Sequence, residues 1–279
     1  MNRGFHRRAF TTVELAAVVV VLFVALLFLP AIMKKQWNAS GLDGSLRNIK
    51  ILLDATAQYR FANAERVPMR GCGYSHGQIT GGWDTWNFAG KNCSTFWIGQ
   101  PFDETAFARP LNAYLPHANI PVPTGYQSTG SGSTWTLNQG IPTLADRASL
   151  QIKVCKSPGD VATRQRAWPG TTPGVSCYDD VGTSYHVNMM WWSQTGWPLD
   201  FTPHYNAGTE RMRRLGTVDL ARPFGWISDQ TATVVASGGN IPGEFGGANM
   251  SVTGFLTGDA AYLHITGLTG ADYTFLLKP

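Results

Sequence analysis

The longest apolar stretch of the chain lies near its amino terminus. Residues 15–33 are nineteen consecutive residues without a charge, and most of them are aliphatic or aromatic. As a helix rising 1.5 Å per residue, this stretch would be about 28 Å long, which is close to the hydrocarbon thickness of a bilayer. Within lipid, a single segment satisfies its backbone hydrogen bonds only as a helix. The pattern therefore predicts a transmembrane helix over residues 10–33.

A second helical pattern follows the apolar stretch. Apolar side chains recur there at steps of three and four, at Leu46, Ile49 and Leu53, with Leu52 and Tyr59 beside them. This spacing is typical of an amphipathic helix that packs one face against a domain. We expect residues 34–68 to continue the first helix, with Pro68 ending it.

The rest of the chain has the pattern of a β-rich domain. Short runs of β-branched and aromatic residues alternate there with segments rich in glycine, proline and serine, at 150–155, 183–192, 224–228, 231–236, 250–256, 260–266 and 273–277. We expect one globular head over residues 69–279. The predicted fold class is α+β, with a long N-terminal helix packed on an antiparallel β-sheet.

Charge excludes one class of partner and orients the chain. Charged residues make up 14% of the sequence, and the net charge is +4, of which Arg3, Arg7 and Arg8 supply three. The remainder is close to neutral, so no nucleic acid partner is predicted. Because basic residues before an apolar helix favour the cytoplasmic side, we expect the head to be exported.

The four cysteines favour disulfides over a metal site. None forms a CxxC pair, and no histidine stands at zinc-ligand spacing. An exported head favours oxidation of its thiols. Pairing of sequence neighbours, Cys72–Cys93 and Cys155–Cys177, closes loops of about twenty residues, each worth about 3 kcal/mol.

Glu14 is a carboxylate at the start of the apolar stretch. A charged side chain within lipid costs about 2–3 kcal/mol, so an acid in this place is by default a functional residue. The alternative is an acid that lies at the membrane surface, in contact with water.

The residues around Glu14 resemble a known processing signal. A basic leader, a small residue, Phe10 and an acid four positions later resemble the class III signal of type IV prepilins and type II secretion pseudopilins. The resemblance implies that prepilin peptidase removes the leader, residues 1–9, by cleavage between Ala9 and Phe10, and that the new amino group of Phe10 is methylated. Pro30 lies one position before the proline that these helices share.

The same resemblance implies a mode of assembly. The free amine of one subunit would neutralise Glu14 of its neighbour, which removes a penalty that the isolated subunit bears. The implied partners are identical or related pilin subunits, prepilin peptidase and the inner membrane assembly machinery. The implied location is the inner membrane, with a periplasmic head, and after assembly an extracellular or periplasmic filament.

Two other export signals compete with this interpretation. Arg7 and Arg8 resemble a twin-arginine signal, but such signals favour a mildly apolar stretch without acids. A common secretory signal would end in a small-x-small site, and Leu29-Pro30-Ala31 is a poor match to one.

The head resembles the large planctomycete-type pilin-like proteins that are named for an H-x9-DG motif. The matching segments are Asn48, Lys50, Leu52, Ala55 and Tyr59 with Val67 and Pro68, then 154–160, Thr183, Ser184, Tyr185 and Asn188, and finally 246–249 and 255–259. The histidine of the named motif is absent, and Gly258 and Asp259 stand in reversed order.

Catalysis is not predicted. The sequence has no P-loop, HExxH, GxSxG or dinucleotide fingerprint. The nearest catalytic-looking group is Cys177 with Ser184 and His186, for which a turn leading into a strand is the favoured interpretation.

Two binding roles for the head compete with a purely structural one. The carboxylates of Asp179, Asp180, Asp229 and Asp259 are weak candidates for calcium ligands, because they lack EF-hand spacing. Tryptophans such as Trp83, Trp86, Trp191 and Trp192 suit either a glycan-binding face or, with preference, the core and subunit contacts.

The sequence thus predicts a structural subunit of a type IV pilus-like filament, and not an enzyme. Two alternatives stay open. One is a type II secretion pseudopilin, and the other is a membrane-tethered, glycan-binding module that does not polymerise. No cofactor is predicted.

Overall fold

The computed structural model describes residues 12–69, 85–98, 100, 103–116, 119–120, 143–191, 210, 212–213 and 222–277. Within the first helix, the side chains of residues 12–14, 24–27 and 30–32 lie outside the described part. The chain forms two compact units, residues 1–40 and residues 41–279.

The first helix, α1, runs without a break over Thr12–Ala62. It joins the two stretches that the sequence predicts to be helical. It ends before Pro68 because Ala64 and Glu65 adopt left-handed backbone conformations, with φ of 54° and 62°. The amide of Glu65 donates to the carbonyl of Arg60, which closes the last turn.

The predicted membrane span over residues 10–33 lies partly outside the described residues. Within the part of the chain that the structure describes, no helix is long and apolar enough to cross a bilayer.

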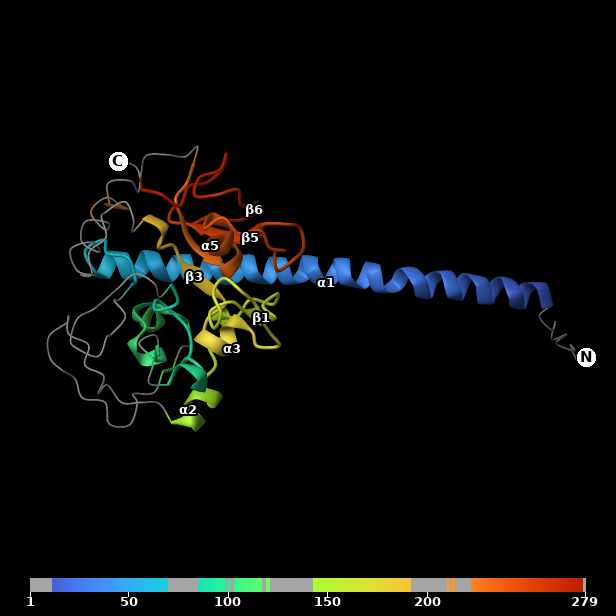
Figure 1. The fold of residues 1–279 in the computed structure, drawn as a ribbon, viewed down its shortest axis with the longest axis horizontal. Helices are drawn as coiled ribbons and strands as arrows, with labels where there is room; N and C mark the ends of the chain where they lie inside the picture. The colour runs from blue at the N-terminus through green and yellow to red at the C-terminus, as the bar shows by residue number, and fades with distance from the viewer. Residues whose placement is uncertain are drawn as a thin grey trace, which may run out of the picture. The chain divides into compact units, whose positions relative to one another are not determined.

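The head contains a four-stranded antiparallel sheet, as the sequence predicts (Figure 1). Its strands, in spatial order, are β3 (Tyr185–Val187), β4 (Gly225–Asp229), β5 (Met250–Phe255) and β6 (Ala260–His264). Tyr185 pairs with Asp229 at one side of the sheet, and Met250 pairs with His264 at the other. A bulge interrupts the pairing of β4 with β5 between Gly225 and Ile227.

Two predicted strands are wrong. Residues 231–236 belong to a helix, α5 (Gln230–Ala236), because Asp229 caps it by accepting from the amide of Thr231. Residues 150–155 form an irregular segment that ends in the 3-10 helix η4 (Lys153–Cys155). The run at 273–277 contributes isolated bridges from Thr274 to Phe224 and to Thr269.

The remaining elements of the described residues are short. They are the 3-10 helices η1 (Thr95–Trp97), η2 (Ala106–Ala108) and η3 (Pro110–Tyr114), the helices α2 (Leu144–Ser149) and α3 (Cys177–Val181), and the strands β1 (Ala162–Thr163) and β2 (Thr172–Pro173), which pair with each other. The helix α3 ends at Gly182, whose φ of 87° places it in the left-handed region.

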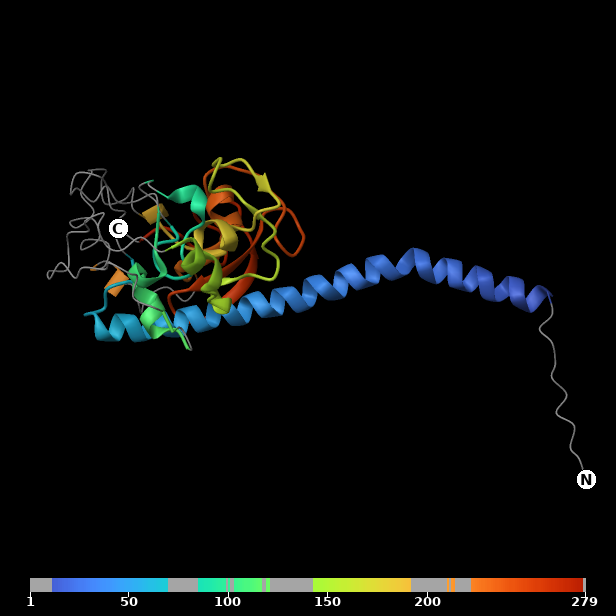
Figure 2. The ribbon, with the colours of Figure 1, turned by 90° about the horizontal axis from the view of Figure 1, so that it is seen from below.

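The carboxyl-terminal part of α1 packs on the sheet, and both ribbon views show the two side by side (Figures 1 and 2). Ile49, Leu52 and Leu53 are buried at this contact, with 4% or less of each exposed. A Cβ added at Gly254 of β5 would lie 2.4 Å from Cγ2 of Ile49 and 2.9 Å from Cδ1 of Leu53. The predicted apolar face of residues 34–68 is therefore confirmed for this part of the helix.

Replacing Gly254 by alanine should lower the free energy of unfolding of the head by about 1–3 kcal/mol, because the added methyl group overlaps Ile49 and Leu53. Gly44→Ala is the matched control. Its Cβ would meet only Cγ of Pro158, at 3.2 Å, and alanine gains about 1 kcal/mol over glycine inside a helix. Urea unfolding followed by circular dichroism measures both. Equal effects of the two variants would contradict this packing.

Candidate functional site

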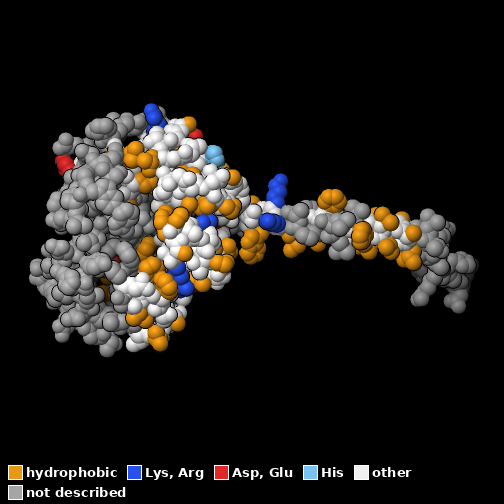
Figure 3. Space-filling model, in the orientation of Figure 1, with side chains coloured by type: hydrophobic (Ala, Val, Ile, Leu, Met, Phe, Trp, Pro, Cys, Tyr) orange, Lys and Arg blue, Asp and Glu red, His pale blue; other side chains and the backbone are white. Residues whose placement is uncertain are grey.

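The amino-terminal part of α1 has large apolar side chains that are exposed. Ten large apolar side chains there are 47–67% exposed: Leu15, Val18, Val19, Val20, Val21, Leu22, Phe23, Phe28, Leu29 and Met33. We call these residues the apolar helix segment, and Figure 3 shows them as hydrophobic surface along the helix. Exposure on this scale is unusual, because burying one such side chain stabilises a protein by about 1.5–3 kcal/mol.

The apolar helix segment has no polar side. Residues 18–23 are six consecutive apolar residues, and each is exposed. Because successive residues of a helix are turned by about 100°, six in a row point in every direction around the axis. A helix that is apolar all round is stable only in apolar surroundings. This segment is therefore built to be covered on all sides.

Four predicted processing and assembly residues lie at or beyond the edge of what the structure describes. Ala9 and Phe10 lie outside the described residues. Glu14 and Pro30 belong to α1, but their side chains lie outside the described part. Their predicted roles stay predictions.

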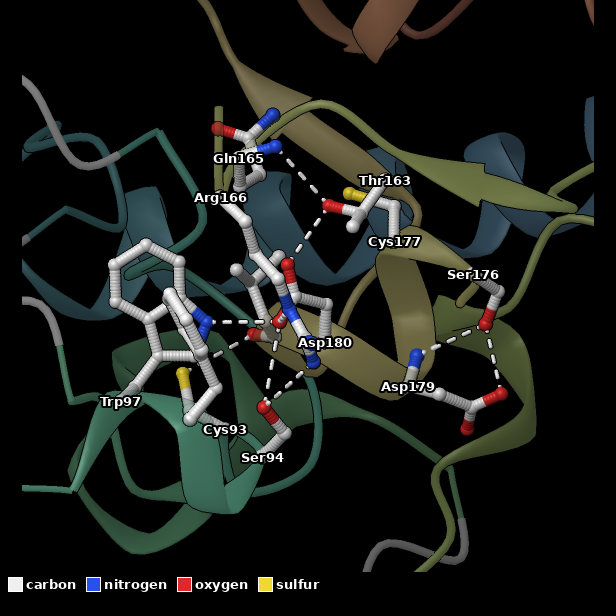
Figure 4. Close-up of polar contacts among 12 residues, drawn as sticks. Cys93, Ser94, Trp97, Thr163, Gln165, Arg166, Ser176, Cys177, Asp179 and Asp180 are labelled. Atoms are coloured by element: carbon white, nitrogen blue, oxygen red, sulfur yellow. Dashed lines mark hydrogen bonds and ion pairs between the residues drawn. The ribbon is translucent and has the colours of Figure 1, made fainter. Parts of the chain in front are cut away.

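The head has a buried carboxylate at Asp180, which is completely buried and accepts hydrogen bonds from four side chains (Figure 4). The donors are Arg166 Nε at 2.7 Å, Thr163 Oγ1 at 2.8 Å, Trp97 Nε1 at 3.0 Å and Ser94 Oγ at 3.3 Å. These side chains come from two segments of the head, residues 94–97 and residues 163–166. Asp180 thus joins α3 to the loop before η1 and to the residues that follow β1.

Its neighbour Asp179 faces the other way and is half exposed. Lys91 Nζ lies 2.8 Å from its Oδ1, and Ser176 donates to its Oδ2 at 2.7 Å. Although partial burial opposes it, these hydrogen bonds hold the pKa of Asp179 below its usual value.

The four aspartates proposed for calcium are not brought together. Asp180 accepts the four hydrogen bonds described above. Asp229 caps α5 and also accepts hydrogen bonds from the hydroxyl of Ser251 and the amide of Val252. Burial raises the pKa of Asp229 to about 6. Asp259 is exposed in the turn between β5 and β6. Among the described residues, no group of three or more acidic, histidine or cysteine side chains is placed to hold a metal ion.

The predicted disulfide between Cys155 and Cys177 is wrong, because both residues are buried free thiols. Cys155 packs in the main core with Ile152 and Tyr185, whereas Cys177 packs in a separate cluster with Trp86 and Trp97. Closeness in sequence therefore does not bring the two sulfur atoms into one cluster. Burial raises the pKa of the Cys155 thiol to about 12. The pairing of Cys72 with Cys93 is untested, because Cys72 lies outside the described residues.

Cys177 and His186 do meet. The Sγ of Cys177 lies 3.3 Å from Nε2 of His186, and the other ring nitrogen lies 2.6 Å from Oγ1 of Thr85. Burial lowers the pKa of His186 to about 3, and burial, with Asp160 and Asp180 nearby, raises the pKa of Cys177 well above its usual value. Both groups are neutral at pH 7, so the pair is no thiolate–imidazolium nucleophile. The hydroxyl of Ser184 donates instead to Asp160, at 2.5 Å.

Two of the four tryptophans proposed for a glycan-binding face belong to the core. Trp86 is 5% exposed and Trp191 is completely buried. The glycan-binding role is therefore wrong for these two, and the core role is confirmed. Trp83 and Trp192 lie outside the described residues.

Segments that carry the resemblance of the head lie together in space. The amide of Ser184 donates to the carbonyl of Cys155, and Asp160 accepts from the hydroxyl of Ser184. Asn188 donates to the carbonyls of Gly225 and Phe275. Cys155, Asp160, Ser184 and Asn188 are all buried, so this part of the resemblance falls on structural residues of the head.

Sequence reasoning missed two polar residues that organise the head. Arg109 is 2% exposed and donates to the carbonyls of Trp86, Ala89 and Val181. Glu244 belongs to no recognised sequence motif. Its carboxyl group accepts a hydrogen bond from the hydroxyl of Ser157 at 2.5 Å. No local spacing marks either residue. The neighbouring Gly246 and Gly247, which adopt φ of 98° and 80°, were a visible sign of a tight turn beside Glu244.

Comparisons with protein-family models, with curated proteins and with solved structures found no significant match to this chain.

Proposed function

We propose that the protein is a structural subunit of a type IV pilus-like filament that assembles through the amino-terminal part of α1. One observation carries the proposal: the apolar helix segment exposes apolar side chains in every direction around the helix. A binding or catalytic role for the head would leave this segment without a purpose beyond attachment.

Side-by-side packing of identical helices would bury the apolar helix segment on all sides. Copies of the same helix side by side cover apolar side chains on all sides, which a globular head covers on one side only. Ala16 and Ala17 allow helices to approach closely, and the four valines that follow them add apolar contact area. The free energy gained on assembly grows with the number of apolar side chains buried, at about 1.5–3 kcal/mol for each.

The residues before the apolar helix segment would supply a pair of opposite charges between subunits. Cleavage between Ala9 and Phe10 by prepilin peptidase would create an amino group four residues from Glu14. In a filament, the amine of one subunit would pair with Glu14 of the next, so that the acid is neutralised only on assembly. Before assembly, the subunit would be held by inner membrane machinery with its head in the periplasm.

The mature amino terminus tests the proposal. We expect the purified filament protein to begin at an N-methylated Phe10, which mass spectrometry of the intact chain and its first peptide detects. Ala9→Gly should be processed normally, whereas Ala9→Leu should retain the leader, because the residue before the cut must be small. An intact leader on the unmodified protein, or a new terminus near Ala31, would contradict the proposal. Filaments on the cell surface indicate a pilus, and filaments confined to the periplasm indicate a secretion pseudopilus.

A further inference from the structure

The contact between α1 and the head contains a chain of hydrogen-bonded hydroxyl groups that ends on Glu244. Oγ of Ser45, on α1, lies 2.9 Å from the hydroxyl of Tyr185 and 3.4 Å from Oγ of Ser157. Ser157 donates in turn to Oε2 of Glu244 at 2.5 Å. Ser45 and Ser157 are both buried. The helix is thus connected to Glu244 through buried hydroxyl groups alone.

Close packing surrounds this chain. A Cβ added at Gly41 of α1 would lie 2.9 Å from Cε1 of Phe245. A Cβ added at Gly159 would lie 2.8 Å from both Cβ of Glu244 and Cε1 of Phe245. The pair Glu244–Phe245 is therefore wedged between the helix and the loop that follows η4. Any outward movement of Glu244 takes Phe245 away from the helix with it.

The carboxyl group of Glu244 is poorly satisfied. Its Oε1 is buried and has no hydrogen-bond partner in the protein, and Glu244 forms no ion pair among the described residues. The two nearby carboxylates, Asp160 and Asp229, accept more hydrogen bonds. Asp160 accepts from the amides of Cys177 and Tyr178 and from Ser184, and Asp229 accepts from three donors.

Only the hydrogen bond from Ser157 favours a charge on Glu244, and its other surroundings oppose one. Burial first, and then Asp229 and Asp160, hold the pKa of Glu244 well above its usual value of 4.5. The other titratable groups that sense it are Tyr185 on β3, Tyr262 on β6 and Cys177 on α3, and none of these is a cation. Lys156, on the adjacent loop, directs its Nζ toward Asp179 instead, at 3.8 Å.

We propose that Glu244 is a proton-operated latch, which holds residues 243–247 against residues 41–48 of α1 while its carboxyl is protonated and releases them when it ionises. An ionised Glu244 would accept one hydrogen bond, from Ser157, while its Oε1 would have no donor. The carboxylates of Asp160 and Asp229 would repel its charge. Movement of the ionised side chain into water would remove this electrostatic and desolvation cost. Phe245 then leaves Gly41, and Ser45 loses its connection to the loop. The latch lies wholly within residues 41–279, so it does not depend on the proposed filament.

The direction of the pH effect follows from linkage. In the released state Glu244 has an ordinary pKa, and in the closed state its pKa is raised, so the closed state binds the additional proton. Release is therefore favoured as the pH rises above about 4.5, by up to tenfold per pH unit, and levels off above the raised value. Below that window the latch is closed.

Hydrogen exchange of the full-length protein in detergent micelles, measured by mass spectrometry from pH 5 to pH 8.5 and corrected for the intrinsic exchange rate, tests the latch. We expect residues 41–48 and 241–249 to lose protection together as the pH rises. Glu244→Gln keeps the shape without the charge, and it should make protection in both segments independent of pH. Asp259→Asn, which changes an exposed acid, should behave as the unmodified protein does.

A pH dependence that persists in Glu244→Gln would assign the effect to Asp160 or Asp229 and overturn the latch. Protection of both segments that does not change with pH in the unmodified protein would also overturn it. If Glu244→Gln fails to fold, the unmodified protein decides alone. The latch then requires that these two segments open before β4 and β5 do, and simultaneous opening of the whole head refutes it.

Discussion

Replacing Glu14 by leucine should leave export and processing intact and reduce the yield of filaments more than tenfold. If the subunit assembles as proposed, the leucine removes the cost of a carboxylate in lipid from the free subunit, so less free energy is gained when subunits associate. It also leaves the amine of a neighbouring Phe10 without its counter-charge, at about 3–5 kcal/mol for each contact. Because every 1.4 kcal/mol changes an equilibrium tenfold, one broken contact suffices.

Filament yield must be compared at equal amounts of processed subunit in the membrane. Glu14→Asp is the matched control, since it keeps the charge and should retain more assembly than the leucine variant. Assembly of Glu14→Leu at the level of the unmodified protein would make Glu14 an acid at the membrane surface. The tethered, non-polymerising module would then be the better interpretation.

Replacing Asp180 by alanine should lower the free energy of unfolding of the head by about 3–5 kcal/mol. The change leaves Arg166, which is largely buried, without its counter-charge and removes the acceptor of Trp97 Nε1 and Thr163 Oγ1. Breaking a buried ion pair from one side has costs of this size. Three segments of the head lose their common attachment together.

Asp179→Ala is the control for this change, one residue away in the same helix. Its carboxylate is half exposed, and its ion pair with Lys91 is of the kind that contributes about 1 kcal/mol or less. Urea unfolding of the two variants, followed by tryptophan fluorescence, gives the comparison. Similar losses in both would show that the contacts in Figure 4 do not organise the head.

The helix and the sheet could be predicted because each repeats a pattern over many residues. Ile49, Leu52 and Leu53 mark the packing face of α1 by spacing alone, and they are buried as expected. The β-branched side chains of residues 231–236 favour a strand. A single cap, from Asp229 to the amide of Thr231, overrides that preference in so short an element.

The interior of the head could not be predicted in the same way. Pairing Cys155 with Cys177 assumed that neighbours in sequence share a cluster, but α3 carries Cys177 and the core residue Tyr178 side by side into different clusters. The burial of Asp180 and Arg109 depends on partners about 20 to 80 residues away. No local pattern records such distances.

The contact between α1 and β5 has a consequence for the synthesis of the chain. Gly254, which lies against Ile49, is made about 190 residues after α1 is complete. At 5–20 residues per second, a ribosome needs roughly 10–40 s to cover that distance. Throughout this interval Ile49 and Leu53 lack the strand β5 against which they pack. A chaperone or the export machinery must shield these side chains, and a chain that stalls before β5 would be a substrate for proteolysis rather than a folded fragment.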